Sequence, residues 1–209
     1  MHKIIAIDGP ASSGKTSLAK KLSKKLNAPI LFSGKLYRAI AFEMIKKNIS
    51  INQPKKILKI VSLLNEDKLK NKNLFNPKID RISSSIATKR FLRNSLLKFQ
   101  RNFPEKNSKN SKYVIIEGRD IGTVVFPNAD FKIFVWADTS IRAKRRYKQI
   151  IKNGKKSSFN RVFADIKKRD YKDLNRKVAP LKPAENSVLL DTTYLDIEQS
   201  FNALKKIIL

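Results

Sequence analysis

The chain has 209 residues, no cysteine and a formal net charge of +29 at pH 7. The lack of cysteine excludes a disulfide framework, a thiolate zinc site and a cysteine nucleophile. The length allows one good-sized core with at most an inserted subdomain, and the hydrophobic fraction of 41% argues for a globular protein.

The positive charge is distributed along the whole chain. A strong excess of basic residues points to nucleic acid or to a membrane surface, but here the lysines are scattered over every predicted helix and loop. Such scattering is more typical of a solvated surface, so we expect no specific nucleic-acid partner. The apolar runs fall short of the roughly 18 residues that span a bilayer, and we expect a cytoplasmic protein without a membrane segment.

The first apolar run, residues 4–7, leads directly into a glycine-rich stretch. Residues 9–16 read Gly-Pro-Ala-Ser-Ser-Gly-Lys-Thr, a complete G-x-x-x-x-G-K-T phosphate loop, and a periodic helix pattern follows. In such a loop, backbone N–H groups surround an anionic oxygen cluster at the positive end of a helix. Lys15 then reaches the β- and γ-phosphates, and the Thr16 hydroxyl can bind Mg²⁺. The alternative is a glycine-bearing turn that binds nothing.

A second motif follows the apolar run at residues 30–32. Residues 33–38 read Ser-Gly-Lys-Leu-Tyr-Arg at the point where the predicted strand gives way to a helix. Ser33 and Arg38 would allow the chain to hold a second phosphorylated ligand. An N-cap serine on an ordinary helix is the alternative interpretation.

Between residues 39 and 112 the pattern changes. Residues 57–64 predict one short amphipathic helix, and the polar stretch 65–80, with its Asn-Pro and Asn-Lys-Asn turn signals, suits small antiparallel strands. Residues 83–99 predict one long helix, with Arg90 and Arg93 beside its apolar face. We interpret this block as an insertion in the core.

The third motif, residues 117–123, follows the β-rich run 114–116. It lies at the carboxyl edge where parallel α/β sheets bind ligands. Glu117 could orient the hydration shell of a metal ion, Arg119 could neutralise a phosphate, and Asp120 could accept a hydrogen bond from an amino group. A salt-bridged turn is the alternative.

Half of the chain's arginines fall between residues 140 and 176, in a predicted helix, a break at Asn153-Gly154 and a second helix. Arginine suits bidentate contacts with phosphate oxygens, so this helical pair is typical of a lid. The spacing of Arg169, Asp173 and Arg176 predicts that they share one helix face. A surface ion-pair ladder has the same spacing.

Short apolar runs at 114–116, 131–135 and 188–190 alternate with helical stretches. Continuous apolar strands of this kind suit a parallel sheet covered by helices on both faces. The sequence therefore predicts an α/β protein.

Four stretches together resemble the bacterial cytidylate kinase family, from Ile4 to about Thr192: IDGPASSGKTSLAKKL, SGKLYRAIA, EGRDIGTVVFPNADFKIF and RDYKDLNRKVAPLKPAENSVLLDTT. The resemblance implies a three-layer P-loop NTPase fold with a central parallel sheet, an inserted NMP-binding subdomain and a helical lid. The core would comprise 1–38 and 103–209, the insertion 39–102 and the lid 142–176. It also implies a monomer that uses ATP with Mg²⁺ to convert CMP or dCMP to its diphosphate.

Site residues follow from the same resemblance. The ATP contacts would be Gly9, Pro10, Ala11, Ser12, Ser13, Gly14, Lys15, Thr16 and Ser17, with Thr16 and, in the second shell, Glu117 at the metal. The CMP contacts would be Ser33, Arg38, Ser84, Arg93, Arg119, Asp120, Arg169, Asp173 and Arg176. Of these, Arg38 and Arg119 would bind the CMP phosphate, and Ser84, Arg93 and Asp120 would read the cytosine. The catalytic cations would be Lys15, Arg119, Arg142, Arg145 and Arg146.

One position departs from the family pattern, since Phe32 stands where an acidic residue usually precedes Ser-Gly. Other functions remain open. A small-molecule kinase of the shikimate or UMP/CMP type and a basic nucleic-acid-binding protein are the alternatives. A phosphate-loop GTPase is disfavoured because the chain has no N-K-x-D and no D-x-x-G.

Overall fold

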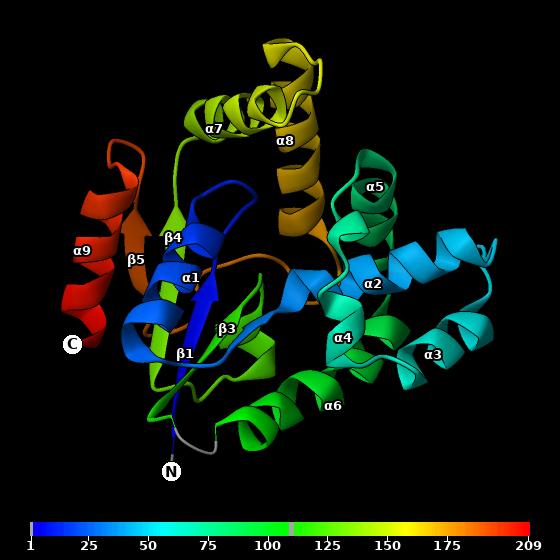
Figure 1. Cartoon of the computed structure of the whole chain (residues 1–209), viewed down its shortest axis with the longest axis horizontal. Coiled ribbons are helices and arrows are strands. Elements are labelled where there is room, and N and C mark those ends of the chain that lie inside the picture. Colours follow the sequence, from blue (N-terminus) through cyan, green and yellow to red (C-terminus); the bar gives the residue numbers. More distant parts are fainter. Residues whose placement is uncertain (1, 109–110) are drawn as a thin grey trace. The chain divides into compact units, whose positions relative to one another are not determined.

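A computed structural model describes residues 2–108 and 111–209, and it divides into two compact units (Figure 1). Unit 1 comprises Met1–Ile30 and Pro104–Leu209, and unit 2 comprises Leu31–Phe103. Residues 31–38, which the sequence analysis assigns to the core, lie in unit 2.

A parallel sheet forms the centre of unit 1. Its strands are β1 (Lys3–Asp8), β3 (Tyr113–Glu117), β4 (Phe131–Trp136) and β5 (Val188–Asp191), and with β2 (Ile30–Phe32) the order is β2-β3-β1-β4-β5. Ile5 lies opposite Ile115 and Phe131. Ile5, Ile7, Ile115 and Ile116 are fully buried because both faces of these strands are covered. The predicted α/β class with a parallel sheet is confirmed.

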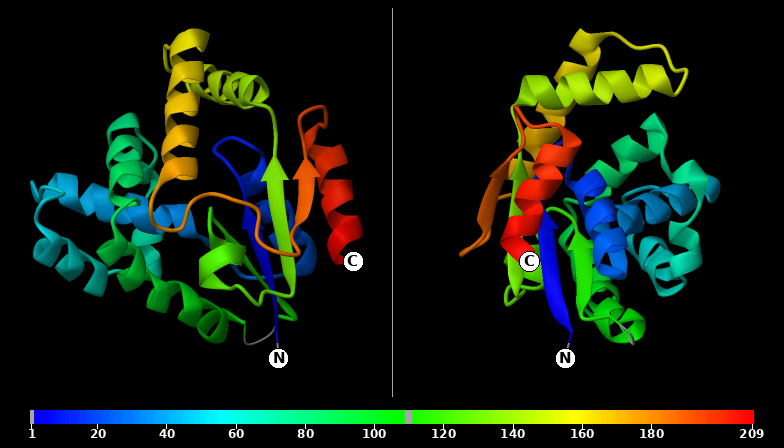
Figure 2. Two further views of the ribbon diagram at one scale, coloured as in Figure 1. Left: turned by 180° about the vertical axis from the view of Figure 1, so that it is seen from behind. Right: turned by 60° about the vertical axis from the view of Figure 1, so that its left-hand side comes forward.

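Different elements cover the two faces of this sheet. Helix α1 (Lys15–Leu26) packs beside α9 (Ile197–Ile208), α1 also contacts β1 and β3, and α9 contacts β5. Seen from behind, the η2 turn (Ile121–Val125) and residues 176–187 cross the other face (Figure 2). Lys132 Nζ of β4 donates to the Glu185 carbonyl at 3.3 Å, which ties this irregular segment to the sheet.

Helices α7 (Thr139–Lys152) and α8 (Phe159–Asn175) stand beyond the carboxyl end of β4 (Figure 2). The predicted pair and its break are confirmed, and Gly154 in the break has a φ of 70°. Phe159 and Phe163 of α8 stack on each other and pack on a small core made of Ala143, Ile166 and Ala11. Ala11 belongs to the phosphate loop, so the loop and the helical pair share this apolar contact.

Apart from Leu31 and Phe32 of strand β2, the regular elements of unit 2 are helical. Its elements are α2 (Ser33–Lys46), α3 (Pro54–Ser62), α4 (Glu66–Leu69), the η1 turn (Lys72–Leu74), α5 (Pro77–Ile86) and most of α6 (Arg90–Asn107). The small strands predicted for residues 65–80 are therefore wrong. Asn65, Asn71 and Asn76 each cap a helical turn, with side-chain oxygens accepting from the N–H of Lys68, Asn73 and Ile79. Asparagine favours turns and helix N-caps alike, which explains the error.

The single long helix predicted for residues 83–99 is also wrong. Helix α5 ends at Ile86, and α6 begins only at Arg90. Arg93 Nη1 donates to the Ala87 carbonyl at 2.9 Å, which satisfies a backbone acceptor at the break. Helix α6 then extends through Pro104 to Asn107, well beyond the predicted end.

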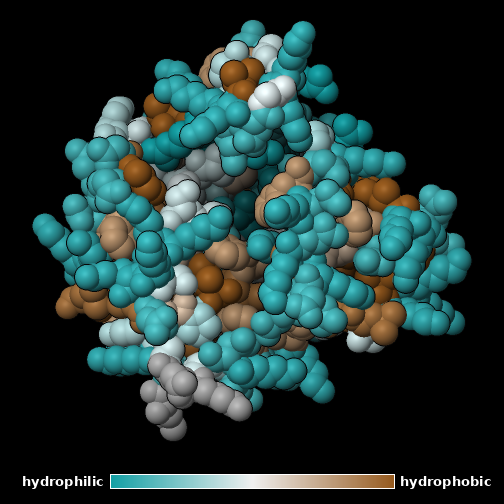
Figure 3. All heavy atoms as spheres, in the orientation of Figure 1, coloured by the Kyte–Doolittle hydropathy of each residue, from teal (hydrophilic) through white to brown (hydrophobic). Residues whose placement is uncertain are grey.

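The surface is mostly hydrophilic. Figure 3 shows polar and charged side chains spread over the visible face, with smaller apolar areas between them. This agrees with the scattered lysines of the sequence. Among the described residues, none of the helices combines the length and apolarity needed to cross a membrane.

Gly9 lies where the fold has no room for a side chain. Its φ is 146°, and an added Cβ would lie 2.1 Å from the Val135 carbonyl oxygen of β4. We expect Gly9→Ala to lower the free energy of unfolding by roughly 2 to 4 kcal/mol, from backbone strain and overlap together. Urea denaturation measures this. In the control Gly34→Ala, nothing lies within 4 Å of the added Cβ, and a loss of similar size there would contradict the explanation.

Candidate active site

The phosphate loop follows directly from β1, and its backbone needs unusual dihedral angles. Gly9, Ser12 and Gly14 have φ values of 146°, 61° and 95°, and Gly14 is the N-cap of α1. Glycine adopts such angles without strain. Ser13 is fully buried, and its hydroxyl has no hydrogen-bond partner among the described residues. The loop therefore presents polar groups and a helix N-terminus at the end of β1.

Lys15 and Thr16 both contact Glu117 at the end of β3. Lys15 Nζ lies 3.4 Å from one carboxylate oxygen, and the Thr16 hydroxyl donates to the other at 3.3 Å. Lys15 Nζ also donates to the Pro10 carbonyl at 3.0 Å. Burial, followed by the charge of Arg119, lowers the pKa of Lys15 to about 7 despite the opposing charge of Glu117. The contacts with Glu117 and Pro10 therefore hold Lys15 in place, but they do not fully compensate the cost of burying its positive charge.

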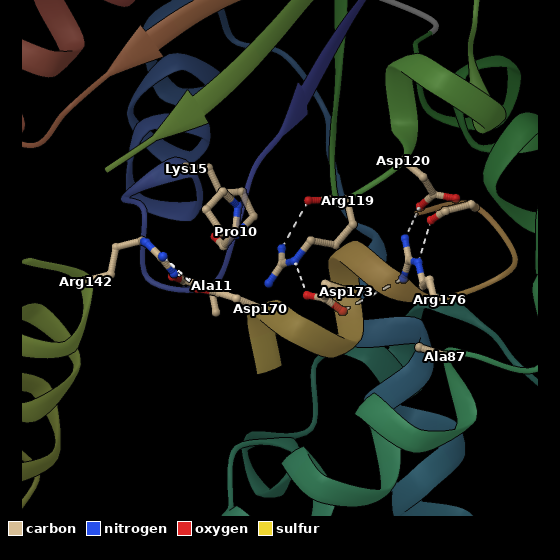
Figure 4. A network of polar contacts seen from close by, with 12 residues as sticks. Pro10, Ala11, Lys15, Ala87, Arg119, Asp120, Arg142, Asp170, Asp173 and Arg176 are labelled. Carbon is tan, nitrogen blue, oxygen red and sulfur yellow. Dashed lines mark hydrogen bonds and ion pairs between the residues drawn. The ribbon is translucent and has the colours of Figure 1, made fainter. Parts of the chain in front are cut away.

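A second cluster centres on Asp173 of α8 (Figure 4). Arg119 Nε donates to its carboxylate at 3.1 Å, and Arg176 Nη1 lies 4.0 Å away. Burial alone would raise the pKa of Asp173, but the charges of Arg119, Arg169 and Arg176 outweigh it and leave the pKa below its usual value. Arg176 also lies 4.0 Å from Asp120. The predicted residues Arg119, Asp120, Arg169, Asp173 and Arg176 are thus brought together.

Arg176 reaches this cluster from a different backbone position than predicted. Helix α8 ends at Asn175, and Arg176 is extended, with φ −67° and ψ 136°. The prediction that it shares a helix face with Arg169 and Asp173 is therefore wrong. Its Nε donates to the Ala179 carbonyl, so the chain turns there and still directs the guanidinium back toward Asp173.

Arg142 is the largest fully buried side chain. Its Nε donates to the Ala137 carbonyl, Nη1 to the Ala11 carbonyl and to Asp170, and Nη2 to Thr139 and to Asp170. These bonds use every N–H group of the guanidinium. The predicted direct contact of Arg142 with a triphosphate therefore has no free donor in this structure. Arg142 instead ties the phosphate loop to α8.

Arg145 and Arg146 occupy different environments on α7. Arg145 donates to the Ser13 carbonyl of the phosphate loop and to Thr192 and Leu195 after β5. Arg146 is half-buried, and its Nη1 donates to Gln149 at 2.9 Å. Arg145 thus holds the backbone of the phosphate loop, whereas the bond of Arg146 to Gln149 stays within α7.

In unit 2, Ser33 and Arg38 come from the first turns of α2. The Ser33 hydroxyl donates to Gln100 Oε1 of α6 at 2.9 Å, and both side chains are buried. The N-cap of α2 is Phe32, so the alternative of an N-cap serine is wrong. Arg38 pairs with Asp80 of α5, donates to the Leu74 carbonyl at 2.9 Å and lies over the Phe75 ring.

The other predicted residues of unit 2 lie at the α5–α6 break. Ser84 is half-buried on α5. Arg93 of α6 is only 6% exposed, donates to the Ala87 carbonyl and lies 5.6 Å from the centre of the Tyr37 ring. Unit 2 therefore holds Ser33, Arg38, Ser84 and Arg93, whereas unit 1 holds all other predicted site residues.

Comparison with known proteins decides the family. The family model described as cytidylate kinase matches residues 5–208. The chain belongs to the cytidylate kinase family. The cytidylate kinase of Bartonella tribocorum is 38% identical over 95% of this chain and 90% of its own length. That of Fusobacterium nucleatum is 38% identical over 97% of this chain and 95% of its own. The resemblance of the motifs is thereby confirmed.

A solved structure supports the fold independently. An uncharacterized protein from Eubacterium ventriosum superposes with a TM-score of 0.55 at 16% identity, covering 100% of this chain and 98% of that one. At this identity the likeness concerns the fold alone. In this member of the cytidylate kinase family, the parallel sheet and the α7–α8 pair, which lies between β4 and β5 in the chain, carry the cluster around Lys15 and Arg119.

Sequence reasoning missed three residues that hold the site together. Gln100 bonds Ser33, Asp170 pairs with Arg142, and Asp8 accepts two backbone N–H groups of η2. Asp8 had a detectable signal, because a carboxylate that ends a buried apolar strand needs internal partners. Gln100 and Asp170 had none, since their partners are distant in sequence.

The pair of Arg142 and Asp170 allows a test of stability. Arg142 is 1% exposed and Asp170 is 13% exposed by side chain, so removal of the carboxylate charge leaves a buried guanidinium uncompensated. We expect Asp170→Asn to lower the free energy of unfolding by about 3 kcal/mol. Chemical denaturation at neutral pH measures the loss. Asp165→Asn, an exposed position on the same helix, serves as control, and equal losses in both variants would refute the buried-pair explanation.

Proposed function

We propose that this chain transfers the γ-phosphoryl group of ATP to CMP or dCMP, giving ADP and CDP or dCDP. The observation that carries the proposal is the linked cluster in unit 1. Lys15 and Thr16 of the phosphate loop contact Glu117, and Arg119, two residues further on, pairs with Asp173. Membership of the cytidylate kinase family supports CMP as the acceptor. We expect the protein to act as a cytoplasmic monomer without a nucleic-acid partner.

Phosphoryl transfer to a monophosphate makes modest chemical demands. The acceptor is already an anionic oxygen, so no general base is needed. The protein has to hold two mutually repelling polyanions in line, exclude water and spread the charge that develops on the transferred group. Lys15, whose pKa is lowered to about 7, and the arginines nearby are cations that gain from such anions.

Each group of residues has a role in this proposal. The phosphate loop binds the ATP phosphates, Arg119 and Arg38 bind the acceptor phosphate, and Arg146 contacts the triphosphate. Arg142 and Arg145, which donate to the Ala11 and Ser13 carbonyls, position the phosphate loop and act without touching nucleotide. The cytosine and its sugar are recognised by Ser33, Ser84, Arg93, Asp120, Arg169, Asp173 and Arg176.

Magnesium fits the residues present. The Thr16 hydroxyl and the Glu117 carboxylate lie 3.3 Å apart, and both are hard oxygen groups of the kind that Mg²⁺ prefers. When bound with ATP, the ion neutralises charge on the β- and γ-phosphates. Thr16 would bind it directly, and Glu117 would orient its water ligands. Lys15 and Arg119 supply the remaining positive charge.

The proposal is tested by a coupled assay with ATP and Mg²⁺ across CMP, dCMP, UMP, AMP and GMP. We expect kcat/KM to be highest for CMP and dCMP. Lys15→Ala and Arg119→Ala should each lose about 10³-fold or more, the scale of losing a cation that stabilises the transferred group. Lys24→Ala, on the exposed side of α1, should retain activity. Higher turnover of another monophosphate, or near-normal kcat in Lys15→Ala, would contradict the assignment.

The lowered pKa of Lys15 predicts proton uptake when ATP binds. A folded-state pKa of about 7 means that the free protein holds Lys15 largely uncharged at pH 8. Phosphates beside the amine raise its pKa, so a proton is taken up with the nucleotide. Calorimetry at pH 8 in buffers of different ionisation enthalpy counts this proton. Uptake should be absent in Lys15→Met, and equal uptake in both proteins would assign the proton to another group.

A further inference from the structure

Asp8 is a buried carboxylate to which the proposed reaction gives no role. It is the last residue of β1, is 4% exposed and directly precedes Gly9 of the phosphate loop. Its Oδ1 accepts from the Ile121 N–H at 2.9 Å, and its Oδ2 accepts from the Gly122 N–H at 2.8 Å. Both carboxylate oxygens therefore bind the backbone of η2.

These two bonds join the start of the phosphate loop to the segment that carries Arg119 and Asp120. Ile121 follows Asp120 directly, and one further backbone bond, from Gly118 N to the Ile7 carbonyl at 3.0 Å, fixes the other end of the segment. A carboxylate presents a separate acceptor oxygen to each of the two N–H groups, whereas an asparagine in the same place offers one oxygen and turns an NH₂ donor toward the other N–H. The ionised form of Asp8 satisfies this arrangement best.

We propose that Asp8 is a positioning residue for phosphoryl transfer, whose ionised carboxylate holds Arg119 and Asp120 in register with the phosphate loop. The inference rests on the proposed function for its effect on turnover. The contact itself lies entirely within unit 1. Since Arg119 is separated from Ile121 by one residue, loss of either bond frees the segment that aims the guanidinium.

The charge of Asp8 opposes the stability of the fold. Burial raises its pKa to about 7, the bonds from Gly122 and Ile121 lower it, the charge of Asp120 raises it and that of Arg119 lowers it. Lys132 of β4 also packs near this contact, since its Cγ lies 3.5 Å from the position of a Cβ on Gly122. Between pH 7 and 4 the folded state therefore binds a proton that the unfolded state does not. The Asp8 contribution to stability rises as pH falls through 7 and declines as pH rises.

Activity should follow the opposite trend. A protonated carboxyl is uncharged and one of its oxygens becomes a hydroxyl, a weaker acceptor, so the bonds from the two N–H groups weaken. As pH falls through about 7, the Asp8 contacts that position Arg119 weaken while the folded state gains stability. A purely structural carboxylate would move activity and stability together, so opposite trends distinguish the two roles.

The test compares the wild-type protein with Asp8→Asn between pH 5.5 and 8.5. At pH 8 we expect Asp8→Asn to lose roughly 10- to 100-fold in kcat/KM for CMP, the scale of a small misplacement in a phosphoryl-transfer site. The ratio of wild-type to variant activity should shrink as pH falls to 6, while the Tm of the wild type rises relative to the variant. The ratio cancels titrations that both proteins share, such as those of Lys15 and of the CMP phosphate.

Two further variants provide controls. Asp130 accepts from the Ile4 N–H at 2.8 Å at the other end of β1, so Asp130→Asn removes the same kind of bond and should leave the pH profile unchanged. Gly122→Ala places a Cβ 3.1 Å from that of Ala184 and 3.6 Å from Asp8 Oδ2. It should displace the Gly122 N–H, which among the contacts of Asp8 lowers its pKa most. The acid limb of the pH–activity profile of Gly122→Ala should therefore lie at higher pH than that of the wild type.

Amide NMR separates the bracing contact from catalysis. The Gly122 and Ile121 N–H resonances should titrate with a midpoint near pH 7 in the wild type and not in Asp8→Asn. An absent titration overturns the contact, whether or not the protein turns over CMP. Normal kcat/KM of Asp8→Asn at pH 8, or a pH-independent activity ratio, overturns the positioning role. If the wild type phosphorylates no monophosphate, the proposed function fails, and the NMR result still decides the contact.

Discussion

Compensation of positive charge around the phosphate loop is the constraint on which the rest of this structure depends. Lys15 and Arg142 donate to backbone carbonyls of the phosphate loop, and Arg119 lies 4.0 Å from Glu117, the partner of Lys15. Each of these cations is paired with a carboxylate from another element: Glu117, Asp173 and Asp170. Without these partners, the buried cations would repel one another and the loop would open. The carboxylates thus hold the cations in place until an anionic ligand arrives.

These carboxylates differ in how far they leave the partner cation able to bind an anionic ligand. Asp170 takes two of the N–H donors of Arg142, and the Ala137 and Ala11 carbonyls and Thr139 take the others, so this arginine joins the phosphate loop to α8 and has no donor left for a ligand. Glu117 only partly neutralises Lys15, whose pKa stays lowered because burial and Arg119 outweigh the carboxylate. The same cluster therefore contains one cation that serves the fold and one that a polyphosphate would stabilise. This difference follows from burial and the number of hydrogen bonds, since both side chains carry the same formal charge.

Much of the fold was predictable because its signals are local. Residues 114–116 and 131–135 are continuous apolar runs, which indicate buried parallel strands, and Asn153-Gly154 marks the break between α7 and α8. The prediction of small strands for residues 65–80 failed because asparagine favours both hairpin turns and helix N-caps. The helix-face prediction for Arg176 failed for another reason, because helix α8 ends one residue before it. The internal bonds of Arg142 had no signal in the sequence, since an arginine pairs as well with a distant carboxylate as with phosphate.

The sequence by itself determined the phosphate loop, the family and the class of fold, because a glycine spacing, a lysine and an apolar run act within a few residues of each other. Only the tertiary structure decided which cations are used internally, that Asp8 braces η2 and that Ser33 bonds Gln100. Those contacts join residues far apart in the chain. The strength of these contacts depends on the distance between the interacting groups and on their burial, and neither quantity can be read from the amino-acid sequence alone.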